Sequence, residues 1–267
     1  MKHVGIVVKS LFLFILVKYI TLFGVNSLFS YLYMSSGSTG DLPLEWLNNA
    51  ANVSTILSSI ILLIVLFKWQ PVRWAHDQWE RLTPFYFSLL TVLGFLGFAL
   101  NSIIISYFRG PYDQIVELSR SLFESSWTGV IGVVLFVPLV EELIFRRVCI
   151  ESFKKEMGPF AAIVLSALLF GVLHMQPLQI LSATLLGLLF GVIYHFSRSL
   201  LPTLFLHVLN NGLYVYNLLT SKEEVESIFF TKDNPYILFV LILLLLLFGF
   251  TFYLAYRRRR LDKSFIN

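Results

Sequence analysis

Charged residues are scarce in this chain of 267 residues. Only 13% of them are Asp, Glu, Lys or Arg, whereas 57% are hydrophobic, and the mean hydropathy is +0.78. Soluble domains carry about 25% charged residues, so this composition excludes an ordinary soluble domain. A chain that crosses lipid must satisfy its backbone polar groups within itself, usually as helices. The composition therefore predicts an all-α, polytopic integral membrane protein.

Cysteine is nearly absent, since Cys149 is the single one. One cysteine excludes an intrachain disulfide and a cysteine-rich metal site. Cys149 stands among charged residues at the end of an expected helix, and we interpret it as a small packing residue rather than a nucleophile. The sequence also has no internal repeat, no glycine-rich phosphate loop and no HExxH pair.

The long apolar runs predict about eight membrane crossings, since a helix needs about 20 apolar residues to span the hydrocarbon layer. Lysines precede the first run, but no small-residue cleavage site follows it, so we expect an uncleaved helix rather than a signal peptide. The expected crossings are 4–33, 50–68, 84–107, 127–153, 158–175, 178–196, 200–220 and 235–256.

These crossings divide the chain into three parts. Residues 1–126 hold about three helices and an amphipathic segment, 111–126, which we expect to lie in the outer interface or to re-enter the membrane. Residues 127–220 form the expected core on helices four to seven. Residues 221–267 hold a loop, the last crossing and a basic tail.

The lysines and arginines predict that both termini are cytoplasmic, because cytoplasmic loops are enriched in these residues. With eight crossings, fourteen of them fall on the inside and four on the outside, and Lys9 and Lys18 lie in the first helix. The run Arg257–Arg260 follows the last apolar segment and is an ordinary stop signal, so the basic pI does not indicate a nucleic-acid partner. The short loops favour a bacterial plasma membrane.

A few polar residues are expected at membrane depth. Fourteen of the sixteen acidic residues fall in predicted loops, tails or helix ends, and the other two are Glu141 and Glu142. His174, His207 and Asn211 are also expected inside crossings, with Asn210 beside Asn211. Ionisable groups at membrane depth are costly and usually functional.

The expected hairpin around Gly158 brings several of these residues to one level. Glu141 precedes Met157 by sixteen residues and His174 follows Gly158 by sixteen, so both lie about 24 Å from the turn at 1.5 Å per residue. His207 is about 14 Å beyond the turn at Arg198 on the same scale. If the hairpin around Gly158 extends about 10 Å farther than the turn at Arg198, the three residues lie at one depth. One carboxylate and two imidazoles from three helices would then lie close together.

Helical spacing adds three pairs of residues that share a face. Glu142 and Arg146 are four residues apart, the spacing of an intrahelical ion pair. That pair would neutralise one buried charge and leave Glu141 free to face another helix. Phe170 with His174 and His207 with Asn211 have the same spacing. Each pair alone could serve packing, and it is their common depth that favours a functional site.

These residues form three motifs that resemble those of a known family. EELIFR (141–146) is similar to EExxxR, FGVLH (170–174) to FxxxH, and HVLNN (207–211) to HxxxN. In this order on separate helices, they resemble the CPBP family of intramembrane proteases, which includes CAAX prenyl proteases, bacteriocin-processing proteins and abortive-infection proteins. The resemblance covers about 127–215.

The resemblance implies a peptidase that cuts membrane-associated or lipid-modified peptides or proteins. By motif position, Glu141 and His174 would activate the attacking water. His207 and Asn211 would stabilise the oxyanion, and Glu142, Arg146 and Phe170 would support the site. The family's expected partners are the lipid bilayer and a membrane-associated substrate.

The sequence leaves two questions open. Glu141, His174 and His207 would also suit a Zn²⁺ ion, because two histidines and a carboxylate leave an open position for water. We therefore expect either no cofactor or Zn²⁺. The alternatives to a protease are a non-catalytic immunity or scaffold protein of the same fold and a proton-coupled transporter, although the repeats typical of transporters are missing.

Overall fold

The computed structural model describes residues 2–69, 83–107, 120–124, 126–220 and 237–264, and every regular element in these ranges is a helix. The all-α fold predicted from composition is thus confirmed. The helices are α1 (Lys2–Ser35), α2 (Leu44–Trp69), α3 (Pro84–Tyr107), α5 (Trp127–Ile131), η2 (Gly132–Phe136), α6 (Val137–Glu142), η3 (Leu143–Ile150), α7 (Glu151–Met157), α8 (Pro159–Val172), α9 (Pro177–Ser197), α10 (Leu201–Thr220) and α11 (Ile237–Ser264).

Five helices in the described ranges are long and apolar enough to cross a membrane: His3–Ser35, Leu44–Trp69, Pro84–Ile104, Trp127–Met157 and Pro177–Ser197. Two shorter apolar helical stretches in the described ranges are Pro159–Val172, which is α8, and Ile242–Arg257 within α11. Helix α10 carries the polar residues of HVLNN. The chain is therefore a polytopic helical membrane protein, and the number of eight crossings stays a prediction.

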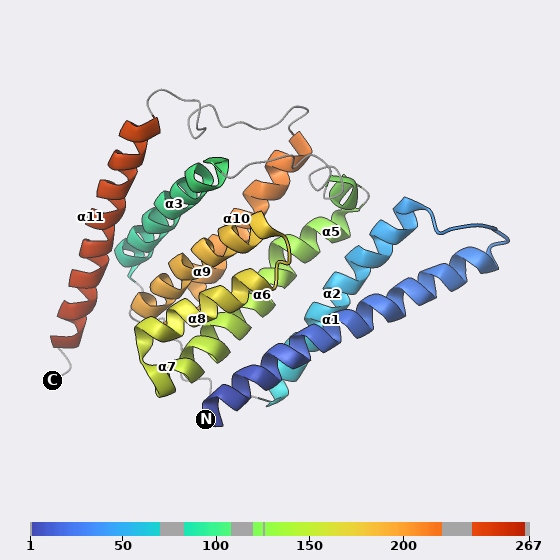
Figure 1. The fold of residues 1–267 in the computed structure, drawn as a ribbon, viewed down its shortest axis with the longest axis horizontal. Coiled ribbons are helices and arrows are strands. Elements are labelled where there is room, and N and C mark those ends of the chain that lie inside the picture. Colours follow the sequence, from blue (N-terminus) through green and yellow to red (C-terminus); the bar gives the residue numbers. More distant parts are fainter. Residues whose placement is uncertain (1, 70–82, 108–119, 125, 221–236, 265–267) are drawn as a thin grey trace.

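The helices form three groups (Figure 1). The long helix α5–α7 lies at the centre with α8, α9 and α10. Helices α1 and α2 pack together as a hairpin against one side of this centre, where α1 contacts α7 and α2 contacts α5 and α6. Helices α3 and α11 pack together on the opposite side and contact α9. The expected core segment is thus enclosed from both sides.

The start of α1 and the end of α11 lie on the same side of the bundle as the α7–α8 turn (Figure 1). This position of the two ends is the one expected of a chain that crosses the membrane an even number of times. Which side faces the cytoplasm stays a prediction from the lysine and arginine distribution. Of the amphipathic segment 111–126, residues 111–119 and 125 lie outside the described ranges. Residues 120–124 are helical, and the Asn52 side chain donates a hydrogen bond to the Leu122 carbonyl at 2.9 Å.

The central helix is irregular where it carries the motif EELIFR. Segments η2 and η3 are π-helical and flank α6 on both sides. Short π-helical segments within α-helices occur often at functional sites. Pro138, which has no N–H, stands near the start of α6 and ends the first π-helical segment. The helix ends at Gly158, whose φ of 82° allows the sharp turn into α8 at the predicted position.

Helices α8 and α9 approach each other closely because small residues line their contact. A Cβ atom added to Gly187 would lie 3.1 Å from the Ala167 backbone and 3.2 Å from the Phe170 ring. At Gly191 it would lie 2.8 Å from the Ile163 side chain. Small residues are the usual means by which membrane helices bring their backbones together. This close contact holds Phe170 and the end of α8 against the central helix.

We predict that Gly187→Val destabilises the fold by about 1–3 kcal/mol, because it forces extra carbon atoms into a filled contact. Thermal unfolding of the purified protein in detergent would measure the effect. Gly24→Val is the matched control, since a Cβ atom there meets nothing within 4 Å. Equal midpoints for the two variants would contradict the prediction.

Candidate active site

Glu142 is the most enclosed acidic residue of the site, with 1% of its surface exposed. Its Oε1 atom accepts a hydrogen bond from His207 Nδ1 at 2.8 Å, and its Oε2 atom lies 3.2 Å from Arg146 Nε. The predicted pair with Arg146 is present, and the bond to His207 is an addition that the sequence did not indicate. One carboxylate thus joins α6, η3 and α10.

Arg146 is held by aromatic faces as well as by this ion pair. Its guanidinium carbon lies 4.9 Å from the Phe170 ring centre and 5.4 Å from that of Phe190. Rings of this kind attract a desolvated cation through their quadrupoles. No hydrogen bond satisfies the Arg146 N–H groups within the described part of the chain. The ion pair and the two rings therefore provide its compensation for burial.

His207 lies between the two adjacent glutamates. While Nδ1 donates to Glu142, Nε2 lies 3.7 Å from Glu141 Oε2, within ion-pair range but too far for a hydrogen bond. The ring packs against Phe190 with centroids 5.3 Å apart. Glu141 is 8% exposed, which is more than Glu142. The geometry therefore separates a firmly bonded carboxylate, Glu142, from a second one, Glu141, without a hydrogen-bond partner in the described residues.

His174 lies just beyond the end of α8 rather than inside a crossing. The backbone N–H of His174 donates to Gly171 O at 2.9 Å, so the last turn is tighter than an α-helical turn. This tightening leaves the Phe170 carbonyl available, and His174 Nδ1 lies 2.9 Å from it. Because a carbonyl only accepts, Nδ1 carries the proton and the neutral ring has its lone pair on Nε2.

The next residues complete a sharp turn into α9. Met175 adopts a left-handed conformation with φ of 64°, and Gln176 N–H donates to His174 O at 2.7 Å. Within the described residues no hydrogen bond or ion pair joins His174 to Glu141. His174 and Glu141 therefore belong to the same site, as expected, but they do not bond to each other directly.

Phe170 is the residue around which the site packs. Its ring centroid lies 5.0 Å from that of Phe145, 4.9 Å from His174 and 5.9 Å from His207. With the Arg146 contact described above, Phe170 touches members of all three motifs. Ser166, one turn earlier on α8, donates from its hydroxyl to Phe145 O at 2.7 Å and fixes α8 against η3.

Asn211 also belongs to this side of α10, one turn beyond His207. Its Nδ2 atom donates to the Val133 carbonyl at 3.0 Å, and its Oδ1 atom lies 3.4 Å from Asn210 Nδ2. An amide nitrogen carries two hydrogens, so one N–H remains after the bond to Val133.

The predicted zinc ligands do not form a metal-binding group in the described residues. No set of three His, Cys, Asp or Glu side chains there is arranged to hold a metal ion. Of the three candidates, Glu141 and His207 approach each other, whereas no hydrogen bond or ion pair in the described residues joins His174 to either of them. We therefore derive no chemical step through a metal, and the zinc alternative stays a prediction.

Other sequence interpretations can be compared with the fold. Cys149 is fully buried in the core cluster, as expected of a packing residue. Arg147, next to Arg146, is also buried, although the sequence indicates a position toward the wet end of the helix, and its Nη1 atom lies 3.5 Å from the Tyr194 hydroxyl. Phe190 and Ser166 were missed, because an apolar ring and a small hydroxyl in an apolar helix give no distinctive sequence signal.

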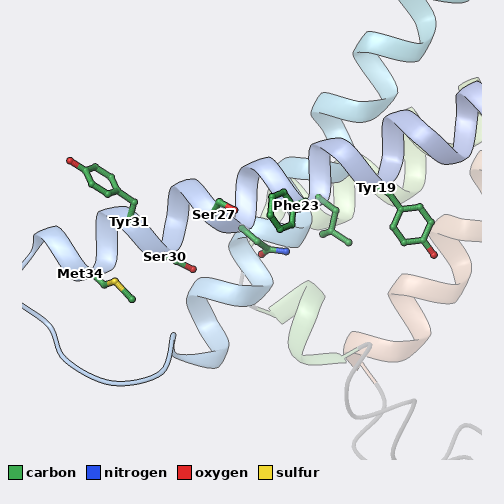
Figure 2. Close-up of a pocket in the computed structure, with 8 residues that line it drawn as sticks. Tyr19, Phe23, Ser27, Ser30, Tyr31 and Met34 are labelled. Atoms are coloured by element: carbon green, nitrogen blue, oxygen red, sulfur yellow. The ribbon is translucent and has the colours of Figure 1, made fainter.

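A hollow of about 670 Å³ lies elsewhere, along α1 (Figure 2). Residues of this single helix line it, among them Tyr19, Phe23 and Tyr31. None of the motif residues contributes to this hollow. It is an open depression on the outer helix and does not form part of the site.

The site is a group of ionisable side chains within a bundle of apolar helices. Glu141 and Glu142 on α6, His207 on α10 and His174 at the end of α8 contribute two carboxylates and two imidazoles. Residues 123–213 match the family described as type II CAAX prenyl endopeptidase Rce1-like. This part of the chain, about a third of its length, is thus similar to the CAAX protease family, in agreement with the three motifs.

A curated relative agrees with this assignment. The chain is 27% identical over 78 residues to "Putative membrane peptidase YdiL" of Bacillus subtilis (strain 168). The match covers 29% of this chain and 32% of that protein, so it spans about a third of the relative's length. No solved structure matches the chain. These comparisons support a membrane protease role in general terms.

We predict that Arg146→Met destabilises the protein by about 3–5 kcal/mol, because it leaves the buried Glu142 carboxylate without its cation. The double variant Glu142→Leu with Arg146→Met is expected to recover part of this loss, since no buried charge remains from the pair. Thermal unfolding in detergent would compare the two.

The exposed pair of Glu151 and Lys154 provides the control. These side chains lie 3.3 Å apart and are about one quarter exposed, so Lys154→Ala is expected to cost less than about 1 kcal/mol. An Arg146→Met variant as stable as the Lys154→Ala variant would contradict the role assigned to the buried pair.

Proposed function

We propose that this protein is an intramembrane endopeptidase that hydrolyses a peptide bond of a membrane-associated or lipid-modified peptide or protein. The observation that carries the proposal is the position of His207 between Glu142 and Glu141, with His174 on the neighbouring helix end. Amide hydrolysis needs a base for the attacking water and donors for the developing oxyanion. The site offers candidates for both.

Glu141 and His174 are proposed to activate the water. Glu141 is the carboxylate that does not bond to His207 or Arg146 directly, so its oxygens remain able to accept a proton. His174 has its Nδ1 proton committed to the Phe170 carbonyl, which leaves Nε2 as an acceptor in the neutral ring. Both groups are thus of the kind that can take a proton from water.

His207 and Asn211 are proposed to stabilise the oxyanion. His207 can donate from Nε2 only when the ring is protonated, because Nδ1 donates to Glu142 in either case. In that form the charges of Glu141, Glu142, Arg146 and His207 sum to zero, which suits a site enclosed by apolar side chains. Asn211 contributes the N–H that is not bonded to Val133.

The substrate is proposed to reach the site from the membrane. The family that matches residues 123–213 is described as type II CAAX prenyl endopeptidase, a name that refers to prenylated chains. The aromatic rings that pack around His174 and His207 are those of Phe170 and Phe190, with Phe145 behind Phe170, so the described surroundings of the site are largely apolar. We therefore propose a membrane-associated chain as the substrate, in a bacterial plasma membrane.

We predict that Glu141→Ala and His174→Ala each abolish cleavage, with rates at least about 10²-fold lower because a general base contributes 10²–10⁴-fold. Comparative peptidomics of membrane and medium from cells with each variant would reveal the missing product. His195→Ala is the control, since His195 contacts Phe196 at the far end of α9. If both variants accumulate normally and every cleavage product persists, the protein is a non-catalytic member of its fold.

We further predict that cleavage survives removal of metal ions, because Glu141, His174 and His207 are not gathered as a ligand set. Purified protein would be treated with a chelator, dialysed and assayed, with its metal content measured in parallel. Loss of activity on chelation that returns on adding Zn²⁺ would contradict this prediction and favour the zinc alternative.

A further inference from the structure

Pro138 interrupts the helix that carries Glu141, three residues before it, and its side chain is buried. In the π-helical segment directly before Pro138, N–H groups reach back five residues, as Val137 N–H does to Gly132 O. The next bond of this series would run from residue 138 to the Val133 carbonyl. Proline has no N–H and cannot form it. Pro138 therefore deprives the Val133 carbonyl of the donor that this register would supply.

Asn211 takes the place of that missing donor. Its Nδ2 atom donates to Val133 O at 3.0 Å from the neighbouring helix α10, which packs against both η2 and α6. Because the carbonyl can only accept, the NH₂ end of the amide must face it, and the rotation of the side chain is thereby fixed. A half-buried amide held in this way presents its second N–H in one defined direction.

We propose that Pro138 is a positioning residue for the oxyanion site, because it reserves the Val133 carbonyl for Asn211. The catalytic part of this inference rests on the proposed function, since only a hydrolase needs Asn211 as an oxyanion donor. The structural part, the bond from Asn211 to Val133, does not. With an N–H at position 138, the helix itself would occupy the carbonyl and the Asn211 amide would be free to rotate. Preorganised donors are effective because they need no reorientation during the reaction.

The first test measures stability and needs no substrate. Asn211→Ala is expected to lower the thermal midpoint by about 2–4 °C, the effect of about 1 kcal/mol in a protein of this size. In the Pro138→Ala background the same change is expected to have almost no effect, because the backbone N–H already satisfies Val133. If Asn211→Ala lowers the midpoint equally in both backgrounds, the proposed exchange of donors is wrong.

The second test measures turnover. Asn211→Ala is expected to lower kcat about 10²-fold, as for other oxyanion donors, and Pro138→Ala about tenfold with little change in KM. In the double variant, Pro138→Ala should add nothing to the loss caused by Asn211→Ala. A further tenfold loss in the double variant would show that Pro138 acts through Glu141 instead and would overturn the proposal. Wild-type kcat in Pro138→Ala would overturn it too.

Pro159→Ala is the matched control. Pro159 is the first residue of α8, where an N–H would have no helical partner, so kcat and midpoint are expected to stay at wild-type values. A wild-type protein without any cleavage activity would contradict the proposed function instead. The stability measurements would still decide whether Pro138 reserves the carbonyl for Asn211.

Discussion

A single buried carboxylate, that of Glu142, connects the helices of the site. It bonds to His207 through one oxygen and pairs with Arg146 through the other. Removing a carboxylate from water is costly, and two basic partners compensate for that cost in this bundle. The rotation of α10 relative to the central helix is thereby set, and with it the position of Asn211. The approach of His207 to Glu141 is a further result of the same bond.

Backbone carbonyls at irregular points of the helices hold the other polar residues. The tight last turn of α8 leaves the Phe170 carbonyl for the His174 ring, and Pro138 leaves the Val133 carbonyl for Asn211. Within the π-helical segment η3, the Phe145 carbonyl accepts from Ser166. In an apolar bundle a carbonyl is one of the few available partners for a polar side chain. Departures from regular helix geometry thus anchor the site.

The sequence predicted those features that depend on fixed helical geometry. The contact of Glu142 with Arg146 follows from a spacing of four residues, and the turn at Gly158 follows from a glycine and a proline between two apolar runs. The common depth of Glu141 and His207 was predicted from the number of residues that separate each of them from its nearest turn.

Other features depend on how each helix is rotated about its axis, which residue counting does not provide. The π-helical segments change that rotation, and apart from Pro138 they leave no mark in the sequence. For this reason the sequence did not indicate that Glu142, rather than Glu141, bonds to His207. It also placed His174 within a crossing, because the early end of α8 is visible only in the backbone. The orientation in the membrane and the roles of the individual site residues stay predictions.

The early end of α8 has a consequence for water. Fourteen residues rise about 21 Å, less than the roughly 30 Å of a hydrocarbon layer, so α8 alone cannot cross it. Irregular backbone at membrane depth is tolerated only where it is covered by protein or lines a wet cavity. Met175 in the turn after α8 is largely exposed, so protein does not cover this turn completely. If the proposed hydrolysis takes place here, we expect the turn beside His174 to be where water, its second reactant, enters the bundle.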